Sequence, residues 1–315
     1  MQRTLYEKTL QPFLSSQKRN EESSGSDSLF SFLLLECAGK AGREEKRERE
    51  KEEMGRNVMK HVFTVIFVLC IGVAAFLGWR LYQKEMEYRA GQESLQEIYS
   101  LMEQAGTAAA EEAPGMTAEE LDRRKLAQYA ALQEENSDVV GWVQIEGTVI
   151  AYPVMYTPED PDFYLYRNFK KEHSAYGSIY LDGACRLDGS TGNLLLYGHH
   201  MRNGDMFASL PKYDDPAYWK EHPEIEFSTL EEVGRYEVIA AFKQPAELVD
   251  EDFMTMLRAG NQKDYEALLT FMKRYRFYDT GIEAQWPDPL ITLATCEYTQ
   301  KDGRFFVVAR KVEEE

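Results

Sequence analysis

Cys296 stands at the end of an alternating apolar run, LITLATC (290–296), where a strand would deliver a thiol to solvent. A thiolate is a strong nucleophile for acyl transfer when its surroundings favour ionisation. A lone cysteine is also commonly a buried structural residue. This segment by itself therefore leaves both roles open.

Two histidines follow a second apolar run, in LLLYGHHM (194–201). Histidine is the side chain best suited to proton transfer near neutral pH. His199 directly follows Gly198, where the run breaks, so its position is better fixed than that of His200. We therefore predict that His199 is the acid/base, with a polar loop or a capping role as the alternative.

Arg304 opens the run GRFFVVAR (303–310), eight residues after Cys296. Two antiparallel strands joined by the intervening turn would set Arg304 beside the thiol. A guanidinium there lowers a thiol pKa and neutralises an oxyanion. A surface charge at a strand edge is the alternative.

Two further arrangements of these cysteines and histidines stay open. Cys185 lies in a turn-like LDGACRLDG stretch, and a disulfide between it and Cys296 is compatible with the spacing. A zinc site from His199, His200 and Cys296 lacks an evident fourth ligand, so we predict no metal there.

Eight short segments must position these groups. They are rich in branched and aromatic residues and are separated by Gly, Pro, Asp or Asn, which predicts a mainly β domain with a barrel or sandwich of about eight strands. Their sequences are VVGWVQI, VIAYPVM, GSIYLD, NLLLYG, EIEFSTL, GRYEVIAAF, PLITLATC and GRFFVVAR. One helical stretch, 252–275, interrupts them before the cysteine strand.

The N-terminal part has a different character. Residues 61–79 contain no Asp, Glu, Lys or Arg, and this length nearly spans a bilayer, which predicts a transmembrane helix within a signal anchor, 54–82. A removable signal peptide is the alternative, and the flanking charges do not decide the orientation. We expect residues 1–53 to be a disordered cytoplasmic tail or the product of an upstream start. Residues 83–116 read as a helical stalk and linker before a catalytic domain, 117–315, whose first helix starts with a Thr117–Glu120 capping box.

The composition restricts the function. The net charge of −18 argues against nucleic-acid binding, which needs clustered basic residues. The hydrophobic share of 43% is sufficient for a sizeable core.

The motifs TLATC (292–296) and YGHH (197–200), with the RFFVVAR strand after them, resemble the signature of sortases. The stretches at 136–154, 162–169 and 177–182, and the MFASL segment after the histidines, are similar to class B sortases. The resemblance covers about residues 121–311. It implies an eight-stranded sortase-type β-barrel with an N-terminal helix and a long helix before the cysteine strand.

The resemblance also implies an activity. Residue by residue, the catalytic cysteine, histidine and arginine fall on Cys296, His199 and Arg304, and Thr295 and Glu297 match positions near the substrate groove. Such enzymes cleave a C-terminal sorting signal of secreted proteins, commonly Asn-Pro-x-Thr in class B, through a thioacyl-enzyme. They need no metal or organic cofactor, and they transfer the protein to a peptidoglycan amine of a Gram-positive wall, from a single-pass membrane anchor with the catalytic domain outside.

Three alternative functions stay open. A membrane-anchored cysteine peptidase or amidase (class EC 3.4.22 in its peptidase form) would hydrolyse rather than transfer, a pilin-polymerising sortase would use another acceptor, and a non-catalytic surface module would bury the cysteine.

Overall fold

The computed structural model describes residues 27–109, 117–297 and 303–312. The chain forms two compact units, residues 1–80 and 81–315. In the first unit the described residues belong to helix α2 (Asp27–Ala109), which continues into the second. Within α2, residues 39–105 form a helix that is long and apolar enough to cross a membrane by length and composition. The predicted transmembrane stretch, 61–79, lies inside it.

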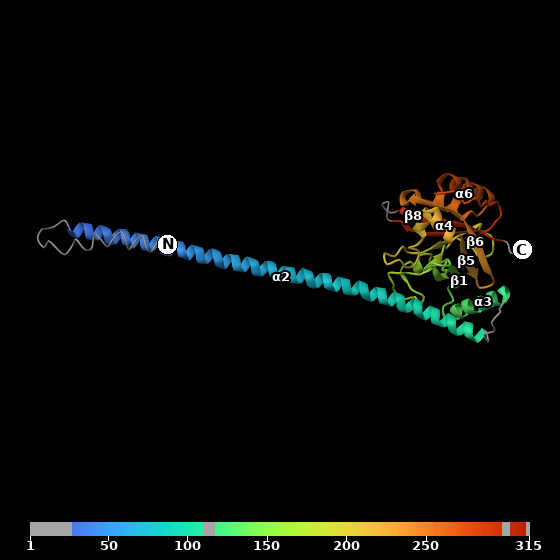
Figure 1. The fold of residues 1–315 in the computed structure, drawn as a ribbon, viewed down its shortest axis with the longest axis horizontal. Coiled ribbons are helices and arrows are strands. Elements are labelled where there is room, and N and C mark those ends of the chain that lie inside the picture. Colours follow the sequence, from blue (N-terminus) through green and yellow to red (C-terminus); the bar gives the residue numbers. More distant parts are fainter. Residues whose placement is uncertain (1–26, 110–116, 298–302, 313–315) are drawn as a thin grey trace. The chain divides into compact units, whose positions relative to one another are not determined.

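The second unit is a closed barrel of eight strands (Figure 1). Neighbouring strands follow the order β1-β2-β3-β4-β7-β8-β6-β5, and the pairs β2–β3 and β4–β7 are parallel. The strands are β1 (Val139–Gln144), β2 (Ala151–Met155), β3 (Ile179–Leu181), β4 (Asn193–Tyr197), β5 (Glu224–Thr229), β6 (Val233–Pro245), β7 (Leu290–Glu297) and β8 (Gly303–Lys311). Each strand overlaps one of the eight predicted segments, so the predicted barrel is confirmed.

Helix α3 (Ala118–Glu135) directly precedes the first strand, and the helices after it lie in the connections between strands. These are η1 (Phe163–Tyr166), η2 (Leu210–Asp214), α4 (Pro216–Glu221), η3 (Ala246–Leu248), α5 (Glu251–Arg258) and α6 (Gln262–Tyr275). The capping box predicted at the start of α3 is present, with the Thr117 hydroxyl accepting from the Glu120 amide and the Glu120 carboxylate accepting from the Thr117 amide. The structure therefore begins α3 where the sequence predicts it.

The helical stretch before the cysteine strand is two helices, not the single long helix predicted over 252–275. Ala259 ends α5 in the left-handed region, with φ of 49°, and Asn261 caps α6 by accepting from the Asp264 amide. A left-handed residue at this position stops a helix, and a side-chain cap starts the next one. The break turns the chain so that α5 packs on β4, while α6 packs on β6.

Two apolar clusters stabilise the second unit. The larger fills the barrel and continues under α5 and α6, with Val143, Ile225, Leu293 and Val307 almost completely buried. The smaller lies where the C-terminal part of α2 and α3 cover the outside of β1 and β2. There the Trp142 ring stacks on Tyr129 at 5.8 Å.

Two N-terminal regions differ from the sequence expectation. The sequence predicts that residues 1–53 are a disordered cytoplasmic tail or the product of an upstream start, but the backbone of residues 27–53 is helical; residues 1–26 lie outside the described residues. The predicted stalk, 83–116, is helical as far as Ala109, but part of it packs on the barrel: Ile98 is only 3% exposed, and the Tyr99 hydroxyl donates to the Ala151 carbonyl. The compact unit accordingly starts at Leu81 rather than at residue 117.

Candidate functional site

Strands β7 and β8 bring the cysteine and the arginine together. They are antiparallel neighbours, and their register places Cys296 directly opposite Arg304. Directly opposed residues have their Cβ atoms about 5 Å apart and point to the same face of the sheet. Cys296 is a free, partly exposed thiol. The guanidinium therefore lies on the thiol's side of the barrel, as predicted.

Strand β4 supplies the histidine from the other side of β7. Its last residue, Tyr197, pairs with Ala294 in a parallel ladder, and the Gly198 amide extends this ladder by donating to the Ala294 carbonyl at 3.2 Å. A side chain at position 198 would collide with Ile179 and Phe207, so glycine is required where the chain leaves the strand. His199 follows at the level of Cys296.

The two histidines take different environments. The His199 ring lines the same groove as Cys296 and Arg304, and its Nε2 lies 2.7 Å from the Leu165 carbonyl oxygen. Because a carbonyl only accepts, Nε2 is the protonated nitrogen in this arrangement. His200 instead places Nδ1 2.9 Å from the backbone carbonyl of Cys296. The structure thus gives His199 the groove position and His200 a backbone contact.

The groove around these three side chains has a volume of about 670 Å³. Its walls come from η1 and the residues before it, from β3 and β4, and from α5 with the loop before it. The aromatic side chains of Tyr166, Tyr180, Tyr197 and Phe306 line the groove together with charged groups such as Asp182 and Arg258. A groove of this size, lined by both apolar and polar groups, can hold a segment of extended peptide.

Comparison with known proteins decides the family. Residues 143–312 match the family model for the sortase domain, which is more than half of the chain. The chain belongs to the sortase family.

The relatives of this sortase are sortases B. It is 28% identical over 261 residues to sortase B of Staphylococcus aureus, covering 80% of this chain and 97% of the relative. It is 28% identical over 250 residues to sortase B of Listeria monocytogenes, covering 78% and 94%. The sortase is therefore of the class B type, an enzyme that acts as a cysteine transpeptidase in cell-wall anchoring.

Solved structures agree with this assignment. The Staphylococcus aureus sortase B–substrate complex superposes with a TM-score of 0.60 at 26% identity, covering 73% of this chain and all of that one. A mutant form of Clostridium perfringens sortase B gives a TM-score of 0.59 at 25% identity, covering 69% and 97%.

The two residues predicted near the substrate groove differ in what the structure says of them. Thr295 lines the groove of the sortase, but it is 3% exposed and its hydroxyl donates to the Gly198 carbonyl at 2.8 Å. That bond joins β7 to the residue before His199, so Thr295 positions the histidine turn. Glu297 pairs with Gly303 through its backbone at the end of β7, and its side chain lies outside what the structure describes.

The alternatives involving Cys185 and zinc are not formed. Cys185 is completely buried and, like Cys296, is a free thiol, so no disulfide joins them. In the described part of the chain, no three His, Cys, Asp or Glu side chains gather as metal ligands.

The sequence did not reveal a charged cluster in the groove wall. Asp182 accepts from Arg258 Nε at 3.0 Å and from the Tyr197 hydroxyl at 2.9 Å, and Arg258 also contacts Glu251 at 2.8 Å. Asp182 and Arg258 are 76 residues apart, and only the docking of α5 on β4 brings them together. The sequence signal for this cluster is Asp182, the charged residue that ends the GSIYLD segment.

Proposed function

We propose that this sortase cleaves a C-terminal sorting signal of secreted proteins and transfers the new carboxyl end to an amine of the peptidoglycan. The observation that carries the proposal is the meeting of Cys296, Arg304 and His199 in one groove, by the register of β7 with β8 and with β4. The similarity to the Staphylococcus aureus sortase B–substrate complex, in which a sortase B holds a substrate, supports the same proposal.

The first half of the reaction forms a thioacyl-enzyme. The Cys296 thiolate attacks the carbonyl carbon of the threonine in the signal, and the oxyanion develops beside the Arg304 guanidinium. The C–N bond then breaks, and the leaving amine takes a proton from His199. The secreted protein stays joined to Cys296 as a thioester.

The second half resolves the thioester. An amino group of a peptidoglycan precursor or cross-bridge attacks the thioester carbonyl and loses a proton to His199. The C–S bond breaks, and the thiolate is restored for another cycle. If water attacks the thioester instead, the same groups hydrolyse it, and the enzyme acts as a cysteine peptidase. Because the first step cleaves a peptide bond through a cysteine, we propose cysteine peptidase as its formal class.

We further propose that α2 anchors the enzyme through the stretch 61–79, as a single pass with the catalytic domain outside the cell. Secreted proteins and lipid-linked wall precursors are both held at that surface, so an anchor raises the effective concentration of both substrates. This gives the acidic domain access to its substrates without electrostatic attraction to anionic polymers.

The test is incubation of the full chain in detergent with quenched peptides carrying Asn-Pro-x-Thr and related signals, with and without an added amine. We expect cleavage, and an amide product by mass spectrometry when the amine is present. Cys296→Ala, His199→Ala and Arg304→Ala should lose turnover, whereas His200→Ala should retain most of it. Exclusive hydrolysis at saturating amine would instead support the peptidase or amidase.

A further inference from the structure

Tyr180 presents a hydroxyl group to the groove that the mechanism above does not use. It is the middle residue of β3, is 8% exposed and lines the groove with Cys296. None of the described residues forms a hydrogen bond with its hydroxyl. The oxygen is also not among the fully buried side-chain atoms without a partner, so it is accessible. The hydroxyl therefore opens to the groove, where a bound molecule can reach it.

The cross-strand neighbour of Tyr180 shows the contrast. Tyr197 pairs with Tyr180 in the β3–β4 ladder, and the two rings lie 5.4 Å apart. The Tyr197 hydroxyl, however, is satisfied by Asp182, which Arg258 holds with two contacts of 3.0 and 3.3 Å. This fixed ring supports the ring of Tyr180, so the open hydroxyl belongs to a well-positioned side chain.

The surroundings make Tyr180 a donor. Burial raises the pKa of its phenol well above the usual range, and the nearby carboxylates of Asp162 and Asp182 raise that pKa further. Cys296 and Arg304 line the same groove as Tyr180, so the hydroxyl lies near the reaction centre. A phenol that stays protonated can donate a hydrogen bond at every pH at which the enzyme works.

We infer that Tyr180 is a substrate-binding residue, whose hydroxyl donates a hydrogen bond to a backbone carbonyl oxygen of the sorting peptide. The inference rests on the proposed function, since it needs a peptide in the groove. An extended peptide carries one carbonyl acceptor per residue, and each must find a donor when the groove takes it out of water. Arg304 serves the developing oxyanion, which leaves Tyr180 for a carbonyl that does not react.

The test compares Tyr180→Phe with the wild-type full chain in detergent, using the quenched peptide that the wild type cleaves best. The substitution removes only the hydroxyl and keeps the ring against Tyr197. We expect KM to rise about threefold to tenfold, the effect of one neutral hydrogen bond, with kcat within about twofold. The rate at which iodoacetamide alkylates Cys296 without peptide should not change.

Tyr156→Phe is the matched control. The Tyr156 hydroxyl donates to the Cys185 carbonyl at 2.7 Å, and Tyr156 does not line the groove. Its loss should lower the melting temperature and leave KM unchanged. An unchanged KM in Tyr180→Phe, or a fall in kcat and alkylation rate with constant KM, overturns the inference alone. A wild-type chain that is alkylated at Cys296 but acylated by none of the peptides overturns the proposed function and the inference with it.

Discussion

Cys296 and Arg304 face each other because they are paired across β7 and β8, and strand alternation gives both side chains the same direction. Arg304 also pairs with Gln244 of β6, so strands on both sides fix its backbone. One Nη atom of its guanidinium donates to the Gly303 carbonyl at 3.2 Å, a bond to the neighbouring backbone. The backbone at Arg304 is thus fixed by the two neighbouring strands. Its guanidinium has five N–H donors that can bind a reaction intermediate.

Replacement of Arg304 tests this role. We expect Arg304→Ala to lower the single-turnover acylation rate by about 100-fold to 1,000-fold, the usual cost of losing an oxyanion donor. Arg304→Lys should recover part of the rate, since it keeps the charge but not the planar fork. Arg310→Ala is the control, because Arg310 lies on the same face at the far end of β8, bonded to Glu237. A loss below about tenfold in Arg304→Ala would contradict the assignment.

The two free thiols of the barrel differ in burial, and this gives a second prediction. Burial raises the pKa of the Cys185 thiol to about 12, whereas Cys296 is partly exposed. Cys185 is therefore neutral at about pH 8 and unreactive until the fold opens or the pH approaches that value. Peptide mapping after iodoacetamide treatment of the native chain should find label on Cys296 and not on Cys185, and on both in denaturant. Equal labelling in the native chain would refute the burial argument.

At the residue scale, local pattern carried most of the site. Alternation and an eight-residue separation were sufficient to predict that Arg304 meets Cys296, and the glycine before His199 distinguished it from His200. The contact of His199 with Leu165 and the cluster around Asp182 were not predictable, because they join residues 34 and 76 positions apart. Such contacts depend on how η1 and α5 pack on the barrel.

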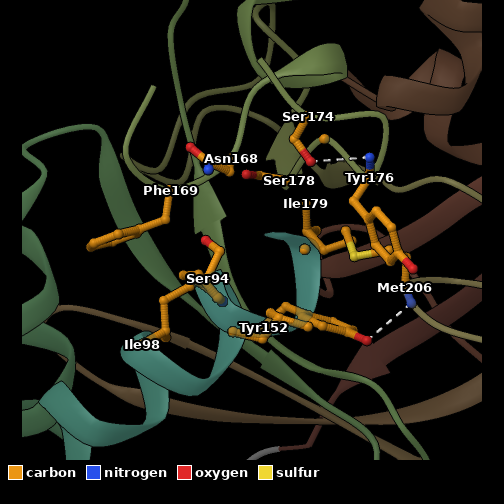
Figure 2. Close-up of a pocket in the computed structure, with 14 residues that line it drawn as sticks. Ser94, Ile98, Tyr152, Asn168, Phe169, Ser174, Tyr176, Ser178, Ile179 and Met206 are labelled. Atoms are coloured by element: carbon orange, nitrogen blue, oxygen red, sulfur yellow. Dashed lines mark hydrogen bonds between the residues drawn. The ribbon is translucent and has the colours of Figure 1, made fainter. Parts of the chain in front are cut away.

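At the scale of elements, the C-terminal part of α2 supports the loop that carries the histidines. Figure 2 shows Ser94 and Ile98 of α2 beside a small pocket whose other wall includes Tyr152 and Met206. The Tyr152 hydroxyl accepts from the Met206 amide at 2.9 Å, and the Gln92 amide donates to Asp205 at 2.7 Å. These contacts act on the site through the backbone of the loop that carries the histidines.

The backbone of this loop connects Met206 and Phe207 to the two histidines. The Phe207 amide donates to the His199 carbonyl at 2.9 Å, and His200 forms an isolated β-bridge with Met206. Met206 itself has a φ of 57°, an uncommon conformation for a residue with a side chain. The hydrogen bond of the Met206 amide to Tyr152 and the contact of Gln92 with the preceding residue, Asp205, offset this backbone strain.

The support can be tested by removing one contact. Gln92→Ala should lower kcat/KM about threefold to tenfold, since one hydrogen bond of about 1 kcal/mol no longer orders the loop. Hydrogen exchange of residues 199–207 should become faster at the same time. Gln96→Ala is the matched control, because Gln96 is the same residue type one helical turn later and is exposed. Equal effects of the two substitutions would show that α2 does not act on the loop.

The elements themselves were predicted unevenly. All eight strands were found from their branched and aromatic composition, because a small barrel has short strands with buried faces. The division between α5 and α6 was missed, although Gly260 and Asn261 carry ordinary stop and cap signals. The packing of Ile98 on the barrel was also missed, since a half-buried helix reads like a polar stalk when its partner strands lie far along the chain.

At the scale of the whole molecule, the chain combines an apolar helix with a catalytic barrel that carries no cofactor chemistry in our proposal. In this proposal the thiol attacks the acyl group, a guanidinium stabilises the developing charge, and one imidazole transfers the protons. Each of these three groups lies in a short motif of the sequence, so the family and the activity class could be predicted from the sequence alone. The specificity of the groove could not, because its walls come from several segments that are distant in the chain.

The most direct measurement is the intact mass of the full chain after brief reaction with a sorting peptide in the absence of amine. We predict an added mass equal to the peptide up to its threonine, located on Cys296 by peptide mapping and released by hydroxylamine. Cys296→Ala should show no adduct. Cleavage of the peptide by the wild type with no such adduct, or with an adduct on another residue, would contradict the account.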